Sequence, residues 1–139
     1  MTVAQSQIER RTNGHRDIQD LTDETQERVN VSKITTGVTH LCGVGSTAAL
    51  STIEFEPGLA RDLPELLDRL IPPSPKYGHE QAWHDGNGHS HLQATLLGPS
   101  LSIPVRNGRL VLGTWQQIVL VECDTRPRDR VVMLTILGE

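Results

Sequence analysis

Residues 101–123 read LSIPVRNGRLVLGTWQQIVLVEC, with apolar segments on either side of Asn107-Gly108. Asn-Gly is favoured at the centre of a two-residue hairpin because both residues tolerate a positive φ. The stretch therefore predicts a β-hairpin. A second Asn-Gly pair, Asn13-Gly14, separates residues 8–12 from residues 15–20 and predicts another hairpin near the N-terminus.

Outside these hairpins the chain carries signals for further strands and helices. Strands are expected at residues 37–42, 48–55 and 131–137. Helices are expected from Thr22 to about residue 35, at 62–70 and, after Ser90 as a cap, at 91–97. The middle helix should begin at residue 62 or 63, because Pro64 is tolerated only near a helix start. Strands outnumber helices, and no repeated strand–helix–strand alternation is visible. This pattern predicts one α+β domain with a mainly antiparallel sheet and two or three helices.

Composition narrows the class of protein. A chain of 139 residues is enough for one domain with a hydrophobic core, and residues 1–6 are expected to fray. The net charge of −4 excludes a general basic field, and no apolar run nears the ~18 residues of a membrane span. We therefore expect neither nucleic acid nor a membrane as a partner. The polar N-terminus and two unpatterned cysteines favour a cytoplasmic location. Three arginines near the C-terminus are a local exception to the net negative charge: Arg126, Arg128 and Arg130. They could bind a phosphate, or they could be solvated without binding one.

Residues 83–91 read WHDGNGHSH and hold three of the six histidines. Imidazole binds metals and anions and transfers protons, and glycines let a backbone approach a ligand closely. We predict a metal site formed by His84, His89 and His91, with Asp85 as a possible fourth ligand, because zinc accepts imidazole and carboxylate. Two alternatives stay open. The imidazoles could transfer protons or bind anions without a metal, or they could only shape a turn or an interface.

Three further segments carry side chains suited to a site. Ser46 and Thr47 could donate hydrogen bonds to a phosphate or carboxylate, although a tight turn would also use them. Trp115 could form the floor of a pocket for a flat ring while Gln116 reads its edge, although packing within a strand is the commoner use of a tryptophan. Glu122 lies in an apolar strand and, if desolvated, is suited to proton transfer; pointing to water is the alternative.

Six motifs, in this order, resemble the YjbQ family of small bacterial and archaeal proteins. They are GSTAAL at 45–50, IEFEPGL at 53–59, WHDGNGHSH at 83–91, LLGPS at 96–100, GTWQQ at 113–117 and LGE at 137–139. The resemblance covers nearly the whole chain. Many family members have Pro-His before the hydroxyl pair, where this chain has Val44-Gly45, so any role of that histidine does not carry over.

The resemblance implies a β-sandwich-like sheet and a homotrimer, with a site at the subunit boundary near the histidine loop and the Gly-Thr-Trp-Gln segment. Recurrent polar and aromatic positions of the family fall on Asn87, His91, Trp115, Gln116 and Glu122. Some members carry the label secondary thiamine-phosphate synthase. That label implies joining a thiazole phosphate to a pyrimidine pyrophosphate, with pyrophosphate leaving, a chemistry that normally uses Mg²⁺.

We therefore expect an enzyme that acts on a small phosphorylated heterocycle, with zinc or magnesium as its only cofactor. The expected catalytic residues are His84, His91 and Glu122, and the expected ligand-binding residues are Ser46, Thr47, Asn87, Trp115 and Gln116. The first alternative is a metal- or small-ligand-binding protein without catalysis. The second is a structural role in which the histidines pair across a trimer interface.

Overall fold

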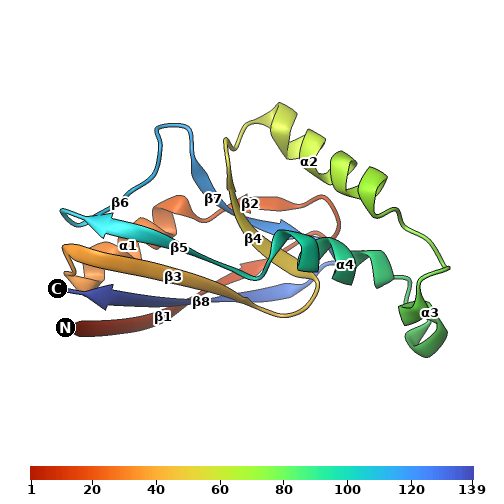
Figure 1. Ribbon diagram of the computed structural model, residues 1–139, viewed down its shortest axis with the longest axis horizontal. Helices are drawn as coiled ribbons and strands as arrows, with labels where there is room; N and C mark the ends of the chain where they lie inside the picture. Colours follow the sequence, from red (N-terminus) through yellow and green to blue (C-terminus); the bar gives the residue numbers. More distant parts are fainter.

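The computed structural model describes all residues, 1–139, as two antiparallel sheets with four helices (Figure 1). The strands are β1 (Thr2–Arg11), β2 (Ile18–Asp20), β3 (Thr36–Val44), β4 (Ala48–Ile53), β5 (Ser100–Arg106), β6 (Arg109–Leu110), β7 (Gln117–Glu122) and β8 (Asp129–Gly138). The helices are α1 (Thr22–Ser32), α2 (Pro57–Leu70), α3 (Gly78–Trp83) and α4 (Gly88–Leu97). The predicted α+β class with mainly antiparallel strands is confirmed, with one helix more than expected.

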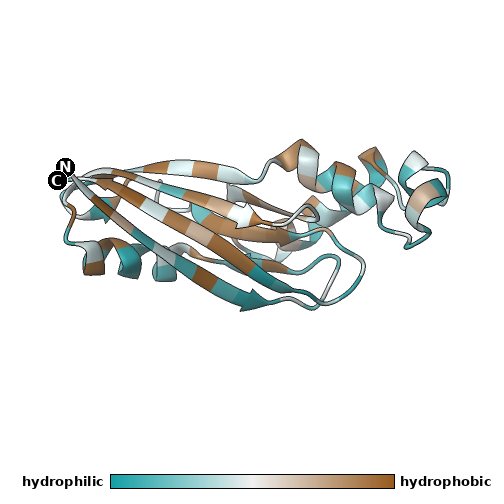
Figure 2. Ribbon diagram, turned by 90° about the horizontal axis from the view of Figure 1, so that it is seen from below, coloured by the Kyte–Doolittle hydropathy of each residue, from teal (hydrophilic) through white to brown (hydrophobic).

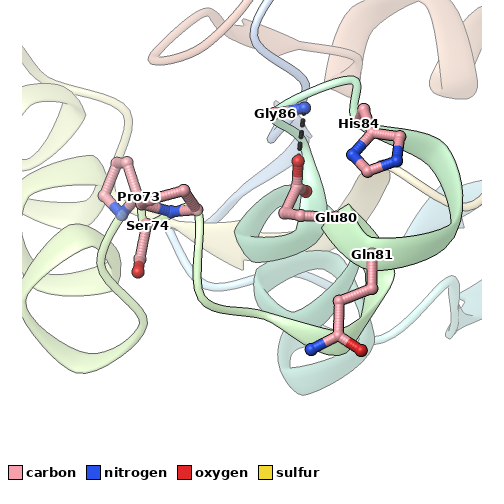
Figure 3. A pocket seen from close by; sticks show the side chains of 7 residues that line it. Pro73, Ser74, Glu80, Gln81, His84 and Gly86 are labelled. Carbon is pink, nitrogen blue, oxygen red and sulfur yellow. Dashed lines mark hydrogen bonds between the residues drawn. The ribbon is translucent and has the colours of Figure 1, made fainter.

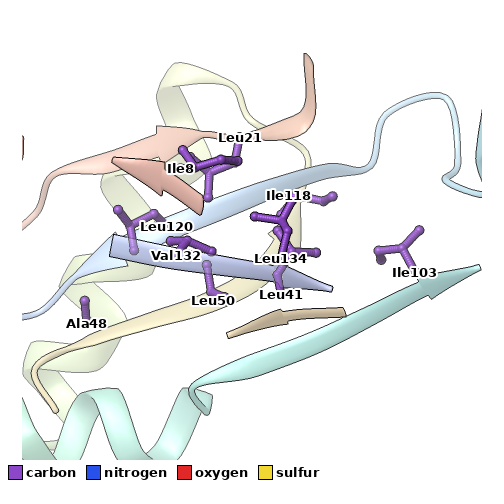
Figure 4. Close-up of a cluster of buried hydrophobic side chains, with 10 residues drawn as sticks. All are labelled: Ile8, Leu21, Leu41, Ala48, Leu50, Ile103, Ile118, Leu120, Val132 and Leu134. Carbon is purple, nitrogen blue, oxygen red and sulfur yellow. The ribbon is translucent and has the colours of Figure 1, made fainter. Parts of the chain in front are cut away.

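The larger sheet has the order β1-β8-β3-β5-β6 and the smaller β2-β7-β4. β8 pairs with β1 on one side and with β3 on the other, so the last strand of the chain lies inside the larger sheet. The smaller sheet packs on one face of the larger, and Figure 4 shows their side chains meeting. The main core between the sheets consists of Ile8, Leu21, Leu41, Ala48, Leu50, Ile103, Ile118, Leu120, Val132 and Leu134.

β7 is buried on both of its faces. Ile118 and Leu120 point into the core between the sheets, while Val119 and Val121 point the other way, into a second cluster with Leu67 of α2 and Ala94 of α4. A continuous apolar run is what a strand covered on both sides needs. The sequence IVLV therefore fixes the middle of the smaller sheet and attaches two helices to it.

The outer face of the larger sheet has no second layer, as the view of Figure 2 shows. Its residues are exposed or half-buried and alternate with core residues along each strand. One row across four strands is apolar: Val3, Leu137, Val38 and Pro104. The next row is polar and uncharged: Gln5, Thr135, His40 and Ser102. We call this surface the open face.

One predicted hairpin is confirmed and the other is wrong. Asn107 and Gly108 have φ values of 51° and 71° and join β5 to β6. Near Asn13-Gly14 the turn instead spans Gly14 to Asp17, and because β1 pairs with β8 and β2 with β7, it joins strands of different sheets. The expectation that residues 1–6 fray is wrong for the same reason, because Thr2 to Arg11 pair in continuous register with Gly138 to Asp129.

Two helix starts lie earlier than predicted. α2 begins at Pro57 because the Glu56 carboxylate accepts hydrogen bonds from the amides of Gly58 and Leu59, and proline suits the first helical position. Pro64 therefore lies inside the helix. α4 begins at Gly88 rather than after a Ser90 cap, and Ser90 is buried within it. No helix is long and apolar enough to cross a membrane.

We predict that Leu120→Ala lowers the free energy of unfolding by about 2–5 kcal/mol, because it removes a fully buried side chain at the centre of the core. Leu70→Ala, on the exposed side of α2, is the matched control and should stay within about 0.5 kcal/mol of the parent. Urea unfolding followed by circular dichroism measures both. Equal losses in the two variants would contradict the central place of β7.

Candidate functional site

The loop between β3 and β4 and the first turns of α4 enclose a cavity of about 250 Å³, which we call the His91 pocket. Its lining consists of Gly45, Ser46, Ala48, His91, Ala94, Thr95 and Pro99. Ser46 is exposed and His91 half-buried, so a hydroxyl and an imidazole both border this cavity. The predicted pairing of the Gly-Ser-Thr loop with a histidine of residues 83–91 is therefore present within one chain.

A group of potential metal ligands lies beside this pocket. One ligand atom each from His79, Glu80 and Asp85 lies within 4.8 Å of the others. The His79 Nε2 atom is 3.2 Å from Asp85 Oδ1, and the His79 ring lies 4.5 Å, centroid to centroid, from that of His91. One imidazole and two carboxylates form a donor set that suits a borderline divalent metal. We call this group the α3 cluster.

Asn87 belongs to the α3 cluster through its side-chain amide. With the amide nitrogen turned toward the acidic group, Asn87 donates to Asp85 Oδ1 at 2.7 Å and to His79 Nε2 at 2.9 Å. Asn87 is buried, so this amide holds the histidine and the aspartate in place rather than facing solvent. Asn87 therefore remains a candidate site residue only because it supports side chains that could bind a ligand.

Glu80 shapes the loop that carries Asp85 and Asn87. Its carboxylate accepts from the backbone amides of Gly86 at 2.6 Å and Gly88 at 2.7 Å, and Figure 3 shows the first of these bonds. A Cβ at Gly88 would lie 2.9 Å from Tyr77 Cβ and 3.0 Å from Glu80 Oε1. Only glycine therefore fits where the loop closes on α3.

The structure does not gather the three histidines predicted as one metal site. His84 ends α3 with a left-handed φ of 55° and points into a separate open pocket with Pro73 and Gln81 (Figure 3). His89 is 2% exposed and its ring faces that of His15. Because positions two apart on a helix point about 200° from one another, His89 and His91 cannot share a metal. One chain therefore does not assemble the predicted three-histidine site, and the potential ligands that do lie together are those of the α3 cluster.

Thr47 and Glu122 belong to a buried network of charges, not to the pocket surface. Glu122 is 1% exposed and its carboxylate accepts from Thr12 Oγ1, from the Asp124 amide and from both Nε and Nη2 of Arg130. Arg130 Nη2 also donates to Thr47 Oγ1. With both oxygens engaged and the side chain buried, Glu122 has the surroundings of a structural ion-pair partner, whereas the sequence predicts a proton-transfer residue.

The same network uses the arginines considered for phosphate. Asp124 accepts from Thr47 Oγ1 at 2.9 Å and from Arg128 Nε at 2.9 Å, so Arg128 is neutralised as Arg130 is. Thr47 gives its proton to Asp124 and its lone pair to Arg130. Of the hydroxyl pair, only Ser46 is therefore free to bind a ligand.

Trp115 and Gln116 lie at the opposite end of the smaller sheet. β4 pairs with β7 so that Ala48 opposes Glu122 and Ile53 opposes Gln117. At about 3.3 Å per residue, the two ends of β4 are roughly 17 Å apart. Gln116 donates to Thr52 Oγ1, and Trp115 is 71% exposed in a loop rather than a strand. One chain therefore does not bring these two residues to the His91 pocket.

His79 and Glu80 are the residues that sequence reasoning missed. Neither lies in a segment with a recognisable ligand spacing, and the helix that carries them, α3, gave no periodic signal over its six residues. A signal was nevertheless present. Glycines at 86 and 88 indicate a backbone that folds closely onto a neighbouring group, and the acidic residue next before Asp85 is Glu80.

Asp124 should make the stability of the protein depend on pH. Burial alone would raise the pKa of its carboxyl, but hydrogen bonds from Thr47, Thr125 and Arg128 and the charge of Arg128 hold that pKa below its ordinary value. Because its folded-state pKa is lowered, the ionised Asp124 carboxylate stabilises the protein fully at pH values above its unfolded-state pKa of about 3.9. This contribution is lost as the pH falls toward the folded-state pKa. We predict a steep loss of unfolding free energy between pH 5 and 3, measured with urea, that Asp124→Asn reduces. Asp62→Asn, at an exposed position, is the control and should show the same dependence of the unfolding free energy on pH as the parent protein.

Comparisons with known proteins agree with the resemblance noted in the sequence. The family model described as UPF0047 protein YjbQ-like matches residues 6–139. A UPF0047 protein of Methanothermobacter thermautotrophicus is 34% identical over 139 residues, covering all of this chain and 95% of that protein. The crystal structure of a YbjQ-like protein of unknown function from Sulfolobus solfataricus P2 superposes with a TM-score of 0.92, at 36% identity and 99% coverage of both chains. A hypothetical protein from Aeropyrum pernix K1 gives a TM-score of 0.87 at 34% identity over the whole of both chains. The chain belongs to the UPF0047/YjbQ family.

Proposed function

We propose that this protein is an enzyme that binds a small phosphorylated heterocycle in the His91 pocket, with a divalent metal held by the α3 cluster. The observation that carries the proposal is that Ser46 and His91 line one cavity, and that the His91 ring lies 4.5 Å, centroid to centroid, from His79 of the α3 cluster. A hydroxyl, an imidazole and a cation are the groups that recognise a phosphate and disperse its charge.

The thiamine-phosphate synthase label within the family gives the most specific reaction. In that transfer a bond forms between the thiazole nitrogen and the pyrimidine methylene carbon while the bond from this carbon to pyrophosphate breaks. No covalent enzyme intermediate is needed. The burden on the protein is to orient two substrates and to stabilise the departing pyrophosphate. Ser46 would orient a phosphate oxygen, and His91, when protonated, would donate to the leaving group.

Zinc fits the α3 cluster better than magnesium does. Magnesium prefers oxygen ligands in an octahedral arrangement, whereas zinc accepts a mixture of imidazole and carboxylate. The Glu80 carboxylate already accepts two backbone hydrogen bonds, so it would bind a metal through its remaining lone pairs. When bound, the metal would supply positive charge beside the His91 pocket, where it would attract the phosphate of the substrate.

A second copy of the chain would complete the site. Trp115 is exposed although the protein has only four aromatic residues of the Phe, Tyr and Trp type, and it lies too far from the His91 pocket of its own chain to form its floor. The open face offers a surface for association, because the two rows that begin at Val3 and Gln5 carry no Asp, Glu, Lys or Arg, while charged residues such as Glu9 and Arg106 lie toward the ends of the face. These two features support the homotrimer implied by the family resemblance, with Trp115 reaching a neighbouring pocket.

Binding without catalysis is the second candidate function. It is favoured by the engagement of Glu122 in a buried ion pair, which leaves the His91 pocket without an acidic general base. In this alternative the protein holds a metal or a phosphorylated ligand and releases it unchanged.

The central test is thiamine-phosphate synthesis by purified protein, freed of metal by chelation and then assayed with zinc, with magnesium or with neither. We expect metal-dependent turnover, reduced by about 10²-fold or more in His91→Ala, since one catalytic proton-transfer group contributes on this scale. Asp62→Asn is the control because Asp62 is exposed on α2, outside the His91 pocket, the α3 cluster and the open face, and it should retain parental turnover.

Two outcomes would separate the candidate functions. Tight binding of zinc, lost in Asp85→Asn, together with no turnover in any metal, would support the binding alternative and reject the enzyme. Turnover that His91→Ala leaves unchanged would reject the His91 pocket as the catalytic site.

If the chains associate through the open face, one substitution on that face should change the mass of the assembly. Met133 is partly exposed near the middle of this face, opposite Cys42. Met133→Lys places a charge in the contact surface, and we expect light scattering after gel filtration to show monomers where the parent forms trimers. Val31→Lys, on the exposed side of α1, should remain trimeric. A monomeric parent, or a Met133→Lys trimer, would contradict association through this face.

A further inference from the structure

The Asp68 carboxylate on α2 collects side chains from two other parts of the chain. Asp68 Oδ1 accepts from His15 Nε2 at 2.8 Å and from Gln93 Nε2 of α4 at 3.0 Å, and Oδ2 accepts from Arg16 Nη2 at 3.0 Å. Beneath this carboxylate, Leu67 packs into the cluster behind β7, while Leu66 and Leu70 are exposed. α2 is thus held by a narrow apolar stripe and by one ionic junction, which we call the Asp68 latch.

His15 has an unusual position in the latch, because both of its ring nitrogens face acceptors. Nε2 faces the Asp68 carboxylate and Nδ1 lies 3.2 Å from the backbone carbonyl oxygen of Cys123. A neutral imidazole carries one N–H, so in either tautomer one of these contacts would set two lone pairs against each other. Only the protonated ring, with two N–H groups, donates to both.

Asp68 is able to keep this proton on the ring. Burial by itself raises the pKa of the Asp68 carboxyl, yet hydrogen bonds from Gln93 and His15 and the charges of His15 and Arg16 bring it below the ordinary value. The carboxylate is therefore ionised throughout the neutral range. Arg16 adopts a left-handed φ of 76°, an unfavourable conformation for a residue other than glycine, and its pairing with Asp68 offsets that strain.

None of the other titratable groups around His15 carries an unpaired charge. The ring of His89 on α4 meets it edge-on with 5.7 Å between centroids, and burial, followed by the charge of His15, lowers the pKa of His89. Burial raises the pKa of the Cys123 thiol to about 12, so it stays neutral. The remaining nearby acids of β7 and its following loop are paired with arginines: Glu122 with Arg130 and Asp124 with Arg128.

We propose that the protonated His15 ring, which donates to both Asp68 and the Cys123 carbonyl, fastens α2 to the body of the protein, and that deprotonation of this ring loosens the helix. The docked arrangement binds the proton and the released one does not require it, so raising the pH must favour release. α2 leads through residues 71–77 into α3, which carries His79 and Glu80. Release of the latch would therefore loosen the chain that supports the α3 cluster. The inference stands on the latch itself and does not require the proposed function.

The test is hydrogen–deuterium exchange of the whole protein at pH 6 and pH 8, corrected for the intrinsic pH dependence of exchange. The amides of α2 are compared with those of β7 in the same sample. We expect α2 to open about tenfold more readily at pH 8, the scale of one lost charge-assisted hydrogen bond, while β7 does not change. His15→Gln keeps a donor but cannot be charged, so its α2 should exchange at pH 6 as fast as parental α2 does at pH 8.

His40→Gln is the matched control, since it removes an imidazole from the open face and should keep the parental pH dependence. A second measurement on the parent protein covers the case in which His15→Gln does not fold. Nitrogen-15 NMR should show both ring nitrogens of His15 protonated at pH 6 and one of them deprotonated at pH 8. A neutral His15 ring at pH 6, equal α2 exchange at both pH values, or pH-dependent α2 exchange in folded His15→Gln would each overturn the proposal.

Discussion

The buried ion pair between Glu122 and Arg130 is the constraint on which the rest of the structure depends. It joins β7 of the smaller sheet to β8 of the larger at the end where the two sheets meet, and Thr12 and Thr47 complete its hydrogen bonds. Two charges withdrawn from water are tolerable only when each is paired and hydrogen-bonded, so this end of the sandwich has little freedom to rearrange. The loop after β3 is fixed in the same way through Thr47.

This constraint explains how a small pocket with few polar groups can be well defined. Thr47 is anchored by its hydrogen bond to Asp124, which leaves its neighbour Ser46 exposed at a fixed position on the pocket wall. On the side of α4, Glu80 fixes the loop before the helix through two backbone amides and so places His91. Both sides of the pocket are thus held by carboxylates that bond to the protein chain itself. Such supporting groups usually decide whether a binding geometry is kept to within a fraction of an ångström.

Local signals in the sequence predicted local structure well and distant pairing poorly. The hairpin at Asn107-Gly108 formed as predicted because turn chemistry and strand pairing agree there. After Asn13 the turn forms over Gly14 to Asp17 instead, and β1 pairs over ten residues with β8, far along the chain, which buries more than pairing with the three-residue β2 could. The early start of α2 was missed because the Glu56 cap was not weighed against Pro64.

The candidate site was predicted in its region but not in its groups. Residues 83–91 do border the pocket, and His91 lines it as expected. The expected histidine set failed because α4 starts three residues earlier than predicted and turns His89 inward. Trp115 and Gln116 were expected beside Ser46, yet strand register alone separates them, and register between β4 and β7 cannot be read from either segment in isolation.

The place of β8 bears on how the protein is made. β8 is synthesised after both strands with which it pairs and lies between β1 and β3, so the larger sheet has no continuous centre until the ribosome has delivered residues 129–138. Until then β1 has no partner in that sheet, and its edge is open to other chains. Folding dominated by such long-range pairing is intrinsically slow. A nascent chain of this protein would therefore be a natural client for chaperones that shield exposed strands, and truncation by even a few C-terminal residues would remove pairing from both β1 and β3 at once.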